Sequence, residues 1–367
     1  MNLVRIRRAI FLILLGLSLF GLLMVYEASS IYAWKIYHSS LYFFRRQLIF
    51  FLISLFVFFV ILGVDSNFFR KYSFPILVFN IFLLILVLIL GKKIGGAKRW
   101  LSLFGFSFQP SEFLKISFLL WCANYFASKN LILNTVEDIF PPLSLVFLIS
   151  FLLLLEPDLG SIIFWFSWMI ISLFLFKAKK RHLFFLLFIG TVVIFFLIKL
   201  YPYRFRRLIY FFNPWRDSKG AGFQLVQSQI AFGNGGIFGV GLGESAQKFL
   251  FLPAAHTDFI FSIIAEEFGF LGSITIIAIY WFLFFSFFKM GVLFKDFFSK
   301  AFCMGTSILL GLEVIINIGV SCGVFPTKGL SLPFISYGGS NLLVHYLLIG
   351  LIFRISKENE NTSYYRI

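Results

Sequence analysis

Residues 47–64 read QLIFFLISLFVFFVILGV, eighteen consecutive positions without a charged side chain. A helix of about 20 such residues spans the roughly 30 Å hydrocarbon layer of a bilayer. Similar apolar runs recur along the chain, in which 60% of 367 residues are hydrophobic and 13% are charged. Because soluble domains carry about 25% charged residues, this composition excludes an ordinary soluble fold. The sequence predicts an integral membrane protein.

The predicted fold class is an all-α polytopic membrane protein of about ten transmembrane helices, folded as one membrane domain over residues 1–367. The interval after the seventh apolar run predicts a large extracytoplasmic loop at about 201–268. A cytoplasmic tail is expected at about 354–367. The predicted spans are 9–26, 47–64, 72–90, 111–127, 139–155, 159–176, 183–200, 269–288, 301–320 and 336–353.

Basic residues at the N-terminus orient the chain. Arg5, Arg7 and Arg8 precede the first span, and Lys and Arg concentrate in cytoplasmic loops, so both termini are expected in the cytoplasm. On this topology, however, the 32 Lys and Arg residues divide about equally between the two sides. The outer basic residues therefore call for a functional explanation. The net charge of +16 indicates lipid head groups, and not nucleic acid, as the anionic partner.

The segment between the third and fourth spans holds the first candidate residues. In the stretch GGAKRW, the glycines permit a tight turn, Lys98 and Arg99 offer phosphate contacts, and Trp100 suits the membrane boundary. An interfacial anchor is the alternative interpretation. Downstream, Glu112 and Lys115 lie three residues apart on one helix face, which predicts a structural ion pair.

Two further outer segments carry charged or glycine-rich motifs. The turn EPDLG at 156–160 holds two carboxylates, which suit acid–base or cation chemistry, with a solvated turn as the alternative. The long loop adds Arg204, Arg206 and Arg207, followed by glycines whose N–H groups would suit an anion. Those glycines are residues 233, 235, 236, 239, 241 and 243.

The sharpest candidate is Asp258, in the stretch LPAAHTDF. It opens an apolar run, where it would serve either as a helix N-cap or, near lipid head groups, as a base for a sugar hydroxyl. The helix dipole and His256 are expected to keep it ionised. Farther along, prolines and glycines around Lys328 predict irregular backbone, which is tolerated at membrane depth beside protein or a water-filled cavity. There Lys328 would face an anionic substrate.

Together, the stretches GAKRW, FQPSE, EPDLG, HTDFIF, PTKG and SYGGS resemble the SEDS family of bacterial cell-wall proteins, in an order that covers nearly the whole chain. NPW at 213–215 and QLVQS at 224–228 are more similar to the cell-division branch of that family than to its elongation branch. The resemblance implies a peptidoglycan glycosyltransferase that polymerises lipid II, a disaccharide-pentapeptide on undecaprenyl pyrophosphate. It also implies a bacterial cytoplasmic membrane protein at the division septum, with a class B penicillin-binding protein and other division proteins as partners.

By this resemblance, Asp258 is the catalytic base that deprotonates the acceptor sugar. A lipid II flippase and a scaffold for the penicillin-binding protein are the alternative functions. The sequence assigns no metal ligands, and a divalent Mg or Mn ion that assists the leaving diphosphate is a hypothesis. The residues implied to bind substrate are Lys98, Arg99, Trp100, Arg204, Arg206, Arg207, Gln227, Ser228, His256, Thr257, Lys328 and Ser336.

The chain departs from the family pattern at two places. Ala254 and Ala255 stand where relatives commonly carry a Glu before the His, which leaves any metal- or substrate-binding role of that Glu without a residue here. Glu313 lies midway through the ninth span, where many relatives carry Gln. Because an unpaired charge is costly there, a neutral acid is expected. Glu313 and Asn317, four residues apart, are the polar pair that supports the flippase alternative.

Overall fold

A computed structural model describes residues 3–94, 97–103, 106–249 and 251–364. Ten long helices correspond to the ten predicted spans, which confirms the predicted fold class. Eight of them are long and apolar enough to cross a membrane, α7 is a shorter apolar helix, and α5 carries two charged residues. The ten are α1 (Leu3–Tyr37), α2 (Tyr42–Gly63), α4 (Ser73–Leu90), α5 (Pro110–Ser128), α6 (Val136–Leu155), α7 (Leu159–Leu175), α8 (Lys180–Lys199), α11 (Ile260–Leu293), α12 (Phe297–Ser321) and α13 (Gly339–Tyr364).

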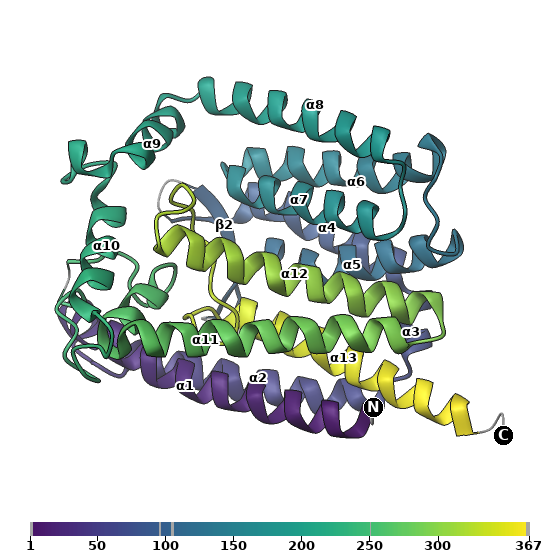
Figure 1. The fold of residues 1–367 in the computed structure, drawn as a ribbon, viewed down its shortest axis with the longest axis horizontal. Coiled ribbons are helices and arrows are strands. Elements are labelled where there is room, and N and C mark those ends of the chain that lie inside the picture. The colour runs from purple at the N-terminus through teal and green to yellow at the C-terminus, as the bar shows by residue number, and fades with distance from the viewer. Residues whose placement is uncertain (1–2, 95–96, 104–105, 250, 365–367) are drawn as a thin grey trace.

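The long helices form one bundle (Figure 1). α13 packs on α2, and α12 packs between α5 and α11. Both termini lie at one end of the bundle, whereas α9 (Pro202–Phe212), α10 (Phe223–Gly235) and the sheet lie at the other, which we call the loop end. That the terminus end faces the cytoplasm stays a prediction.

Short elements fill the connections. α3 (Ser66–Lys71) joins α2 to α4 at the terminus end, and the 3-10 helix η1 (Pro214–Asp217) joins α9 to α10. Between α4 and α5 the strands β1 (Lys92–Ile94), β2 (Ala97–Leu103) and β3 (Phe106–Phe108) form an antiparallel sheet in the order β1-β2-β3. The sequence pattern does not predict this sheet.

α11 begins at Ile260, nine residues before the predicted span, and is broken at Gly269, where φ is 66°. A break in a helix leaves carbonyl and N–H groups without partners inside that helix, and where water is excluded such groups need other partners in the protein. A Cβ atom at position 269 would lie 2.3 Å from the backbone nitrogen of Gly239. Glycine is therefore required here both for the backbone angle and for the close approach of the loop.

The glycine-rich loop after α10 supplies those missing partners. The N–H groups of Val240 and Gly241 donate to the carbonyls of Glu266 and Glu267 over 3.0 Å each. In return, the N–H group of Phe270 donates to the Gly236 carbonyl over 2.9 Å. The N–H groups of Val240 and Gly241 therefore serve the broken helix, and binding of an external anion by the other glycines of this loop stays a prediction.

Buried carboxylates hold the same loop in place. The Glu266 side chain accepts hydrogen bonds from Asn234 Nδ2 at 2.9 Å and from the Ser245 hydroxyl. Lys248 lies between Glu27, at 3.0 Å, and Glu267, at 3.4 Å. The loop is thus clamped to α1 and α11.

Candidate functional site

A cavity of about 410 Å³ opens at the loop end, between α7, α8, α9, α12 and the segment that follows α12. Five charged side chains from four separate parts of the chain line it: Arg99 on β2, Asp158 before α7, Arg204 and Arg207 on α9, and Lys328 after α12. We call it the cation cavity. The fold therefore brings together four of the basic residues that the sequence assigned to an anionic substrate.

Lys328 is the most constrained of these cations. Its aliphatic chain crosses Gly160, where a Cβ atom would lie 2.0 Å from both Cδ and Cε. Among the described residues, its buried Nζ has no hydrogen-bond partner. Burial lowers the pKa of Lys328 to about 8, although the negative charge of Asp158 favours the ammonium form. An unsatisfied ammonium group at a cavity wall is suited to an anionic ligand.

The turn EPDLG is buried against Arg99, so the alternative of a solvated turn is wrong. Glu156 and Asp158 are 1% and 8% exposed. Arg99 Nε donates to the Glu156 carbonyl at 3.0 Å, and its Nη2 donates to the Pro157 carbonyl at 2.7 Å. Burial raises the pKa of the Glu156 side chain to about 8, so this acid is neutral at pH 7.

Asp158 remains ionised beside its neutral neighbour. Its carboxylate caps α7 by accepting from Ser161 N at 3.1 Å and Ser161 Oγ at 2.8 Å. Burial alone would raise the pKa of Asp158, but the charges of Lys328 and Arg99 and the bonds from Ser161 outweigh burial and lower it. The cavity therefore carries one fixed negative charge among its cations.

Asp258 lies beside the cavity, at the start of α11. Its side chain does not cap the helix, whose N-cap is Phe259 without a side-chain hydrogen bond. A Cβ atom on Gly329, which lines the cavity, would lie 2.7 Å from Asp258 Oδ2. Burial raises the pKa of Asp258 to about 6, against the opposing charge of Lys328. A carboxylate with a pKa near 6 is suited to act as a general base at neutral pH.

The expectation that His256 helps to keep Asp258 ionised is wrong. Burial lowers the pKa of His256 to about 4, so its ring is neutral. The ring packs against Phe43 at 4.5 Å and Tyr337 at 5.7 Å between centroids. The charges of Lys328 and, to a smaller extent, Arg99, both of which the sequence assigned only to substrate, favour the Asp258 carboxylate.

Two hydrogen bonds hold the segment with Asp258 against the loop after α12, and a third lies within that loop. The Tyr337 N–H group donates to the His256 carbonyl at 2.9 Å, and Ser336 Oγ donates to the Thr257 carbonyl at 2.6 Å. Ser336 Oγ also accepts from Leu332 N at 2.8 Å. His256, Thr257 and Ser336 thus shape the loops that carry Asp258 and Lys328.

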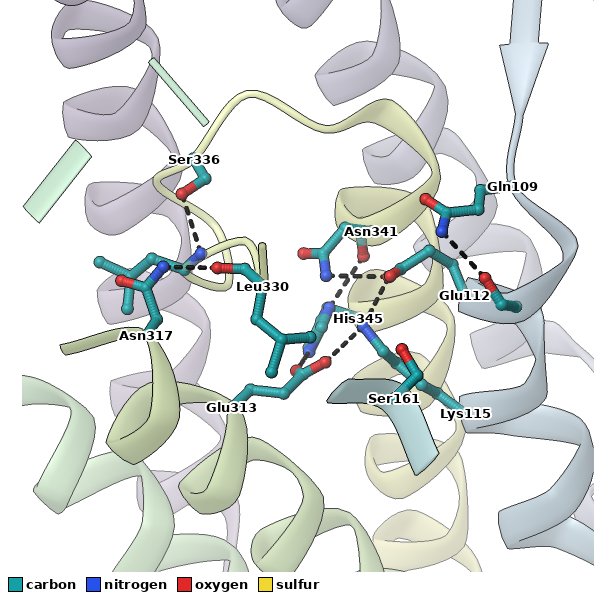
Figure 2. Close-up of polar contacts among 12 residues, drawn as sticks. Gln109, Glu112, Lys115, Ser161, Glu313, Asn317, Leu330, Ser336, Asn341 and His345 are labelled. Atoms are coloured by element: carbon teal, nitrogen blue, oxygen red, sulfur yellow. Dashed lines mark hydrogen bonds and ion pairs between the residues drawn. The ribbon is translucent and has the colours of Figure 1, made fainter. Parts of the chain in front are cut away.

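Asn317, on α12, connects the segment that carries Asp258 to the loop after α12. Its Nδ2 donates to the backbone carbonyl of Asp258 at 3.0 Å and to that of Leu330 at 2.5 Å. Figure 2 shows Asn317 reaching from α12 to Leu330, near Ser336. The sequence offered Asn317 only as support for a flippase. The sequence feature that could have identified Asn317 is an amide side chain in a mostly apolar span.

A buried ionic network lies among α5, α12 and α13 (Figure 2). Lys115 Nζ lies 2.5 Å from Glu112 Oε2 and also contacts Glu313. His345 Nε2 lies 2.6 Å from Glu313 Oε2, and Asn341 Nδ2 donates to Glu112 at 2.9 Å. The premise that Glu313 would be unpaired is therefore wrong. His345 lies on α13, and the sequence analysis did not predict that this helix would supply a partner for Glu313.

Hydrogen-bond roles give this network no net charge. His345 Nδ1 lies 2.8 Å from the Asn341 carbonyl, which only accepts, so Nδ1 carries a proton. One further proton is shared between Nε2 and the Glu313 carboxyl group. The His345–Glu313 pair is thus neutral as a unit, whichever atom holds that proton, and Lys115 balances Glu112.

Lys98 and Trp100 do not line the cation cavity. Lys98 Nζ instead donates to the carbonyls of Leu88 and Ile89, at the end of α4, over 3.3 and 3.2 Å. Arg99, by contrast, bonds the carbonyls of Glu156 and Pro157, so neighbouring residues of β2 make different contacts. Gly95 and Gly96 of the same motif lie outside the described residues.

Three further predicted residues also lie apart from the cavity. Arg206 is exposed on α9 outside the cavity wall. Gln227 is half-buried on α10. Ser228 is buried, with its hydroxyl 2.6 Å from both Ser262 Oγ and the Ser321 carbonyl, which ties α10 to α11 and α12.

The described part of the chain provides no ligand set for the hypothetical divalent ion. No group of three or more His, Cys, Asp or Glu side chains within it is arranged to hold a metal ion.

The sequence is similar to known proteins over nearly its whole length. A family model described as "Cell cycle protein", covering FtsW, RodA and SpoVE, matches residues 7–361. The chain is similar to the probable peptidoglycan glycosyltransferase FtsW of Trichlorobacter lovleyi, with 41% identity over 94% of this chain and 91% of the relative. It is also similar to the protein of the same name from Geobacter metallireducens, with 38% identity over 99% of this chain and 98% of the relative.

Solved structures share the fold. A chain from a peptidoglycan synthase complex, described as coordinating polymerization and crosslinking, superposes with a TM-score of 0.80 at 28% identity, covering 96% of this chain and 97% of that one. The rod shape determining protein RodA of Thermus thermophilus gives a TM-score of 0.72 at 24% identity, covering 96% of each chain.

Proposed function

Because this chain belongs to the FtsW, RodA and SpoVE family of cell cycle proteins, we propose that it is a peptidoglycan glycosyltransferase that polymerises lipid II during cell division. The observation that carries the proposal is the position of Asp258 beside Lys328, at a cavity lined by three further cations. A base next to a diphosphate-sized group of positive charges is what glycosyl transfer from a lipid diphosphate requires.

The reaction begins with proton transfer to Asp258. Its carboxylate takes the proton of the acceptor GlcNAc 4-hydroxyl, and the oxygen attacks C1 of the donor MurNAc. The bond between C1 and the diphosphate oxygen breaks as the new glycosidic bond forms. The electron pair leaves with undecaprenyl diphosphate, and Asp258 holds the proton until solvent accepts it.

The cation cavity would stabilise the leaving group. Negative charge develops on the diphosphate as the C1–O bond breaks, and preorganised charges at such a position lower the barrier most effectively. Lys328 has an unsatisfied ammonium group, and Arg204 and Arg207 extend the positive wall from α9. Asp158 keeps Lys328 protonated at the cavity wall.

Partners and location follow from the same proposal. Similarity to the chain from the peptidoglycan synthase complex supports a crosslinking partner, which we assign to the class B penicillin-binding proteins. The proposed site of action is the division septum, with the loop end on the outer side of the bacterial cytoplasmic membrane.

The flippase alternative has lost its sequence support. Glu313 is held by Lys115 and His345, and Asn317 by two backbone carbonyls, so both polar groups serve contacts within the protein. The purified protein, incubated with lipid II and with or without its partner, is expected to yield a ladder of glycan strands on a gel. Transport of lipid II across sealed vesicles without polymer formation would support the flippase instead.

Polymerisation is expected to follow a bell-shaped pH profile. Asp258 must be deprotonated, so the rate should rise as pH increases through about 6. Lys328 must be protonated, so the rate should fall as pH increases through about 8. Initial rates with lipid II between pH 5 and pH 9.5 measure both limbs.

Lys328→Arg provides the control for the alkaline limb. A guanidinium group stays protonated in this range, so that limb should disappear while the limb near pH 6 remains. A rate that falls equally above pH 8 in the arginine variant would contradict the assignment to Lys328.

Asn317→Leu is expected to slow polymerisation by roughly ten- to a hundredfold. The substitution removes both hydrogen bonds that hold the Asp258 and Leu330 carbonyls, and each such bond contributes about 1 kcal/mol. The base would then be poorly positioned, so kcat should fall more than KM rises, and the acidic limb of the pH profile should move.

Ser307→Ala on the same helix is the matched control. Ser307 Oγ donates to the Phe284 carbonyl at 2.8 Å, away from the cavity. This variant should lose a similar amount of thermal stability and keep its activity and pH profile. If both variants behave alike, the role of Asn317 is only structural.

A further inference from the structure

A groove lies between α4, α5 and the sheet, and we call it the α4–α5 groove. It has a volume of about 570 Å³ and shares no lining residue with the cation cavity. Along α4 its wall runs from Ile76 to Leu90, which is roughly 20 Å at 1.5 Å per residue. That length covers about two thirds of the hydrocarbon layer of a bilayer.

The α4 wall of the groove follows one face of the helix. Residues three and four positions apart lie on one face of a helix, and a row of such side chains is the surface against which another helix packs. Phe79 and Leu90, at the ends of their rows, are 61% and 67% exposed, so the groove opens toward the lipid. The α4 residues that line it are Ile76, Phe79, Asn80, Leu83, Leu86 and Leu90.

Two polar side chains of the groove wall lack hydrogen-bond partners. Asn80 and Ser117 both line the groove and are 4% and 1% exposed. Within the described residues, neither Asn80 Oδ1 nor Ser117 Oγ has a partner, and Asn80 Nδ2 only approaches the Pro110 carbonyl, at 3.5 Å. Because the bilayer core holds no water, unsatisfied polar groups are costly there.

Other hydroxyl groups show how Ser117 could have been satisfied within its own helix. Thr191 Oγ1 donates to the Leu187 carbonyl at 2.8 Å, and Ser273 Oγ donates to the Gly269 carbonyl at 2.9 Å. Ser117 makes no such bond in the described part of the chain. Since no hydrogen bond holds Ser117 Oγ or Asn80 Oδ1 in its present direction, rotation of either side chain can turn it into the groove.

We propose that the α4–α5 groove binds a single transmembrane helix of another protein, and that a polar side chain near the middle of that helix pairs with Asn80 and Ser117. Side chains of Ser, Thr, Asn and Gln form such bonds between helices in membranes. The inference goes beyond the proposed glycosyltransferase activity, because the groove is separate from the cation cavity.

A lipid does not match the groove as well as a helix does. Acyl and isoprenoid chains have no hydrogen-bond donor or acceptor, so a lipid tail would leave both polar groups unsatisfied. Asn80 is the eighth of the 18 residues of α4, so it lies near the middle of the span, away from lipid head groups.

A second copy of this chain also matches the groove less well. Among the eight spanning helices in the described part of the chain, α8 is the least buried and so the most able to enter a groove of another molecule. Thr191 is the only polar side chain between His182 and Lys199, and its hydroxyl group already donates to the Leu187 carbonyl. The donor at the middle of α8 is therefore already used.

Binding of a synthetic transmembrane helix tests the proposal. Full-length protein with a donor dye at its C-terminus is placed in phosphatidylcholine vesicles with an acceptor-labelled leucine peptide of about 20 residues, which carries either one central Asn or leucine alone. Energy transfer is measured at a high ratio of lipid to peptide. The Asn peptide should bind about five- to thirtyfold more tightly than the leucine peptide, which is the usual effect of one hydrogen bond between membrane helices.

Four variants locate the binding site. Asn80→Leu should remove most of the difference between the two peptides without impairing folding, because Oδ1 has no partner to lose. Leu83→Trp places a large ring in the groove wall and should weaken binding of both peptides. Ile85→Trp, on the exposed side of the same helix, and Thr191→Val, which removes a satisfied hydroxyl group, should change neither.

Two results would overturn the proposal. The first is equal binding of the two peptides by the unaltered protein, because the polar groups would then play no part. The second is energy transfer between differently labelled copies of the protein that Leu83→Trp abolishes, because the groove would then serve self-association. No lipid II is present in these measurements, so failure of the glycosyltransferase assignment would appear separately, as absence of polymer in the gel assay.

Discussion

Asp258→Asn is expected to reduce polymerisation of lipid II by at least a hundredfold while the protein remains folded in the membrane. General bases typically contribute 10²- to 10⁴-fold to rates, and an amide of the same shape cannot accept the proton. The Asp258 carboxylate is buried against Gly329, so an uncharged group there should not lower stability. The gel assay with pure protein and lipid II measures the loss.

Asp217→Asn is the matched control for that result. Asp217 is also a loop-end carboxylate, and its Oδ2 accepts from the N–H group of Ala221 at 2.9 Å in the long loop. Its replacement should leave polymerisation within about twofold. Glycan ladders of ordinary length from the pure Asp258 variant would remove Asp258 from the mechanism.

Lys328→Met should have the second-largest effect, also at least a hundredfold. Methionine keeps most of the side-chain length over Gly160 and removes the charge that faces both the leaving diphosphate and Asp258. Removal of one preorganised charge from such a site commonly costs about 10²- to 10³-fold. Because Lys328 lowers the pKa of Asp258, any remaining activity should show an acidic limb above pH 6.

Two companion variants separate this charge effect from simpler causes. Gly160→Ala keeps Lys328 in the sequence but introduces a Cβ atom 2.0 Å from its Cδ and Cε. The lysine side chain must then move, and its displacement should reproduce much of the loss. Arg206→Gln removes a cation of α9 that does not line the cavity and should change the rate little. Equal losses from Lys328→Met and Arg206→Gln would indicate a general charge effect.

The apolar pattern predicted the ten long helices because span length follows directly from bilayer thickness. It missed the true start of α11 because Glu266 and Glu267 precede a glycine and look like the end of a loop. Only the fold shows that the glycine-rich segment pairs with the break at Gly269. The sheet was not predicted because two of its strands, β1 and β3, have only three residues each.

The sequence predicted several residues that lie at or beside the cation cavity, but it did not predict the orientation of their neighbours. Asp258, Arg99 and Lys328 were identified from motifs, and the fold brings them together. Sequence reasoning separated neither Lys98 from Arg99 nor Arg206 from Arg207, because neighbouring residues of a strand or helix point to different sides. It also placed no partner beside Glu313, because His345 is 32 residues away in another helix.

The balanced network of Lys115, Glu112, Glu313 and His345 has an electrical consequence. A membrane potential does about 2.3 kcal/mol of work per 100 mV on each unit charge moved across the bilayer. A cluster whose charges sum to zero experiences almost no net force from that field. The membrane potential should therefore do little net work when this network moves as a unit with α5, α12 and α13.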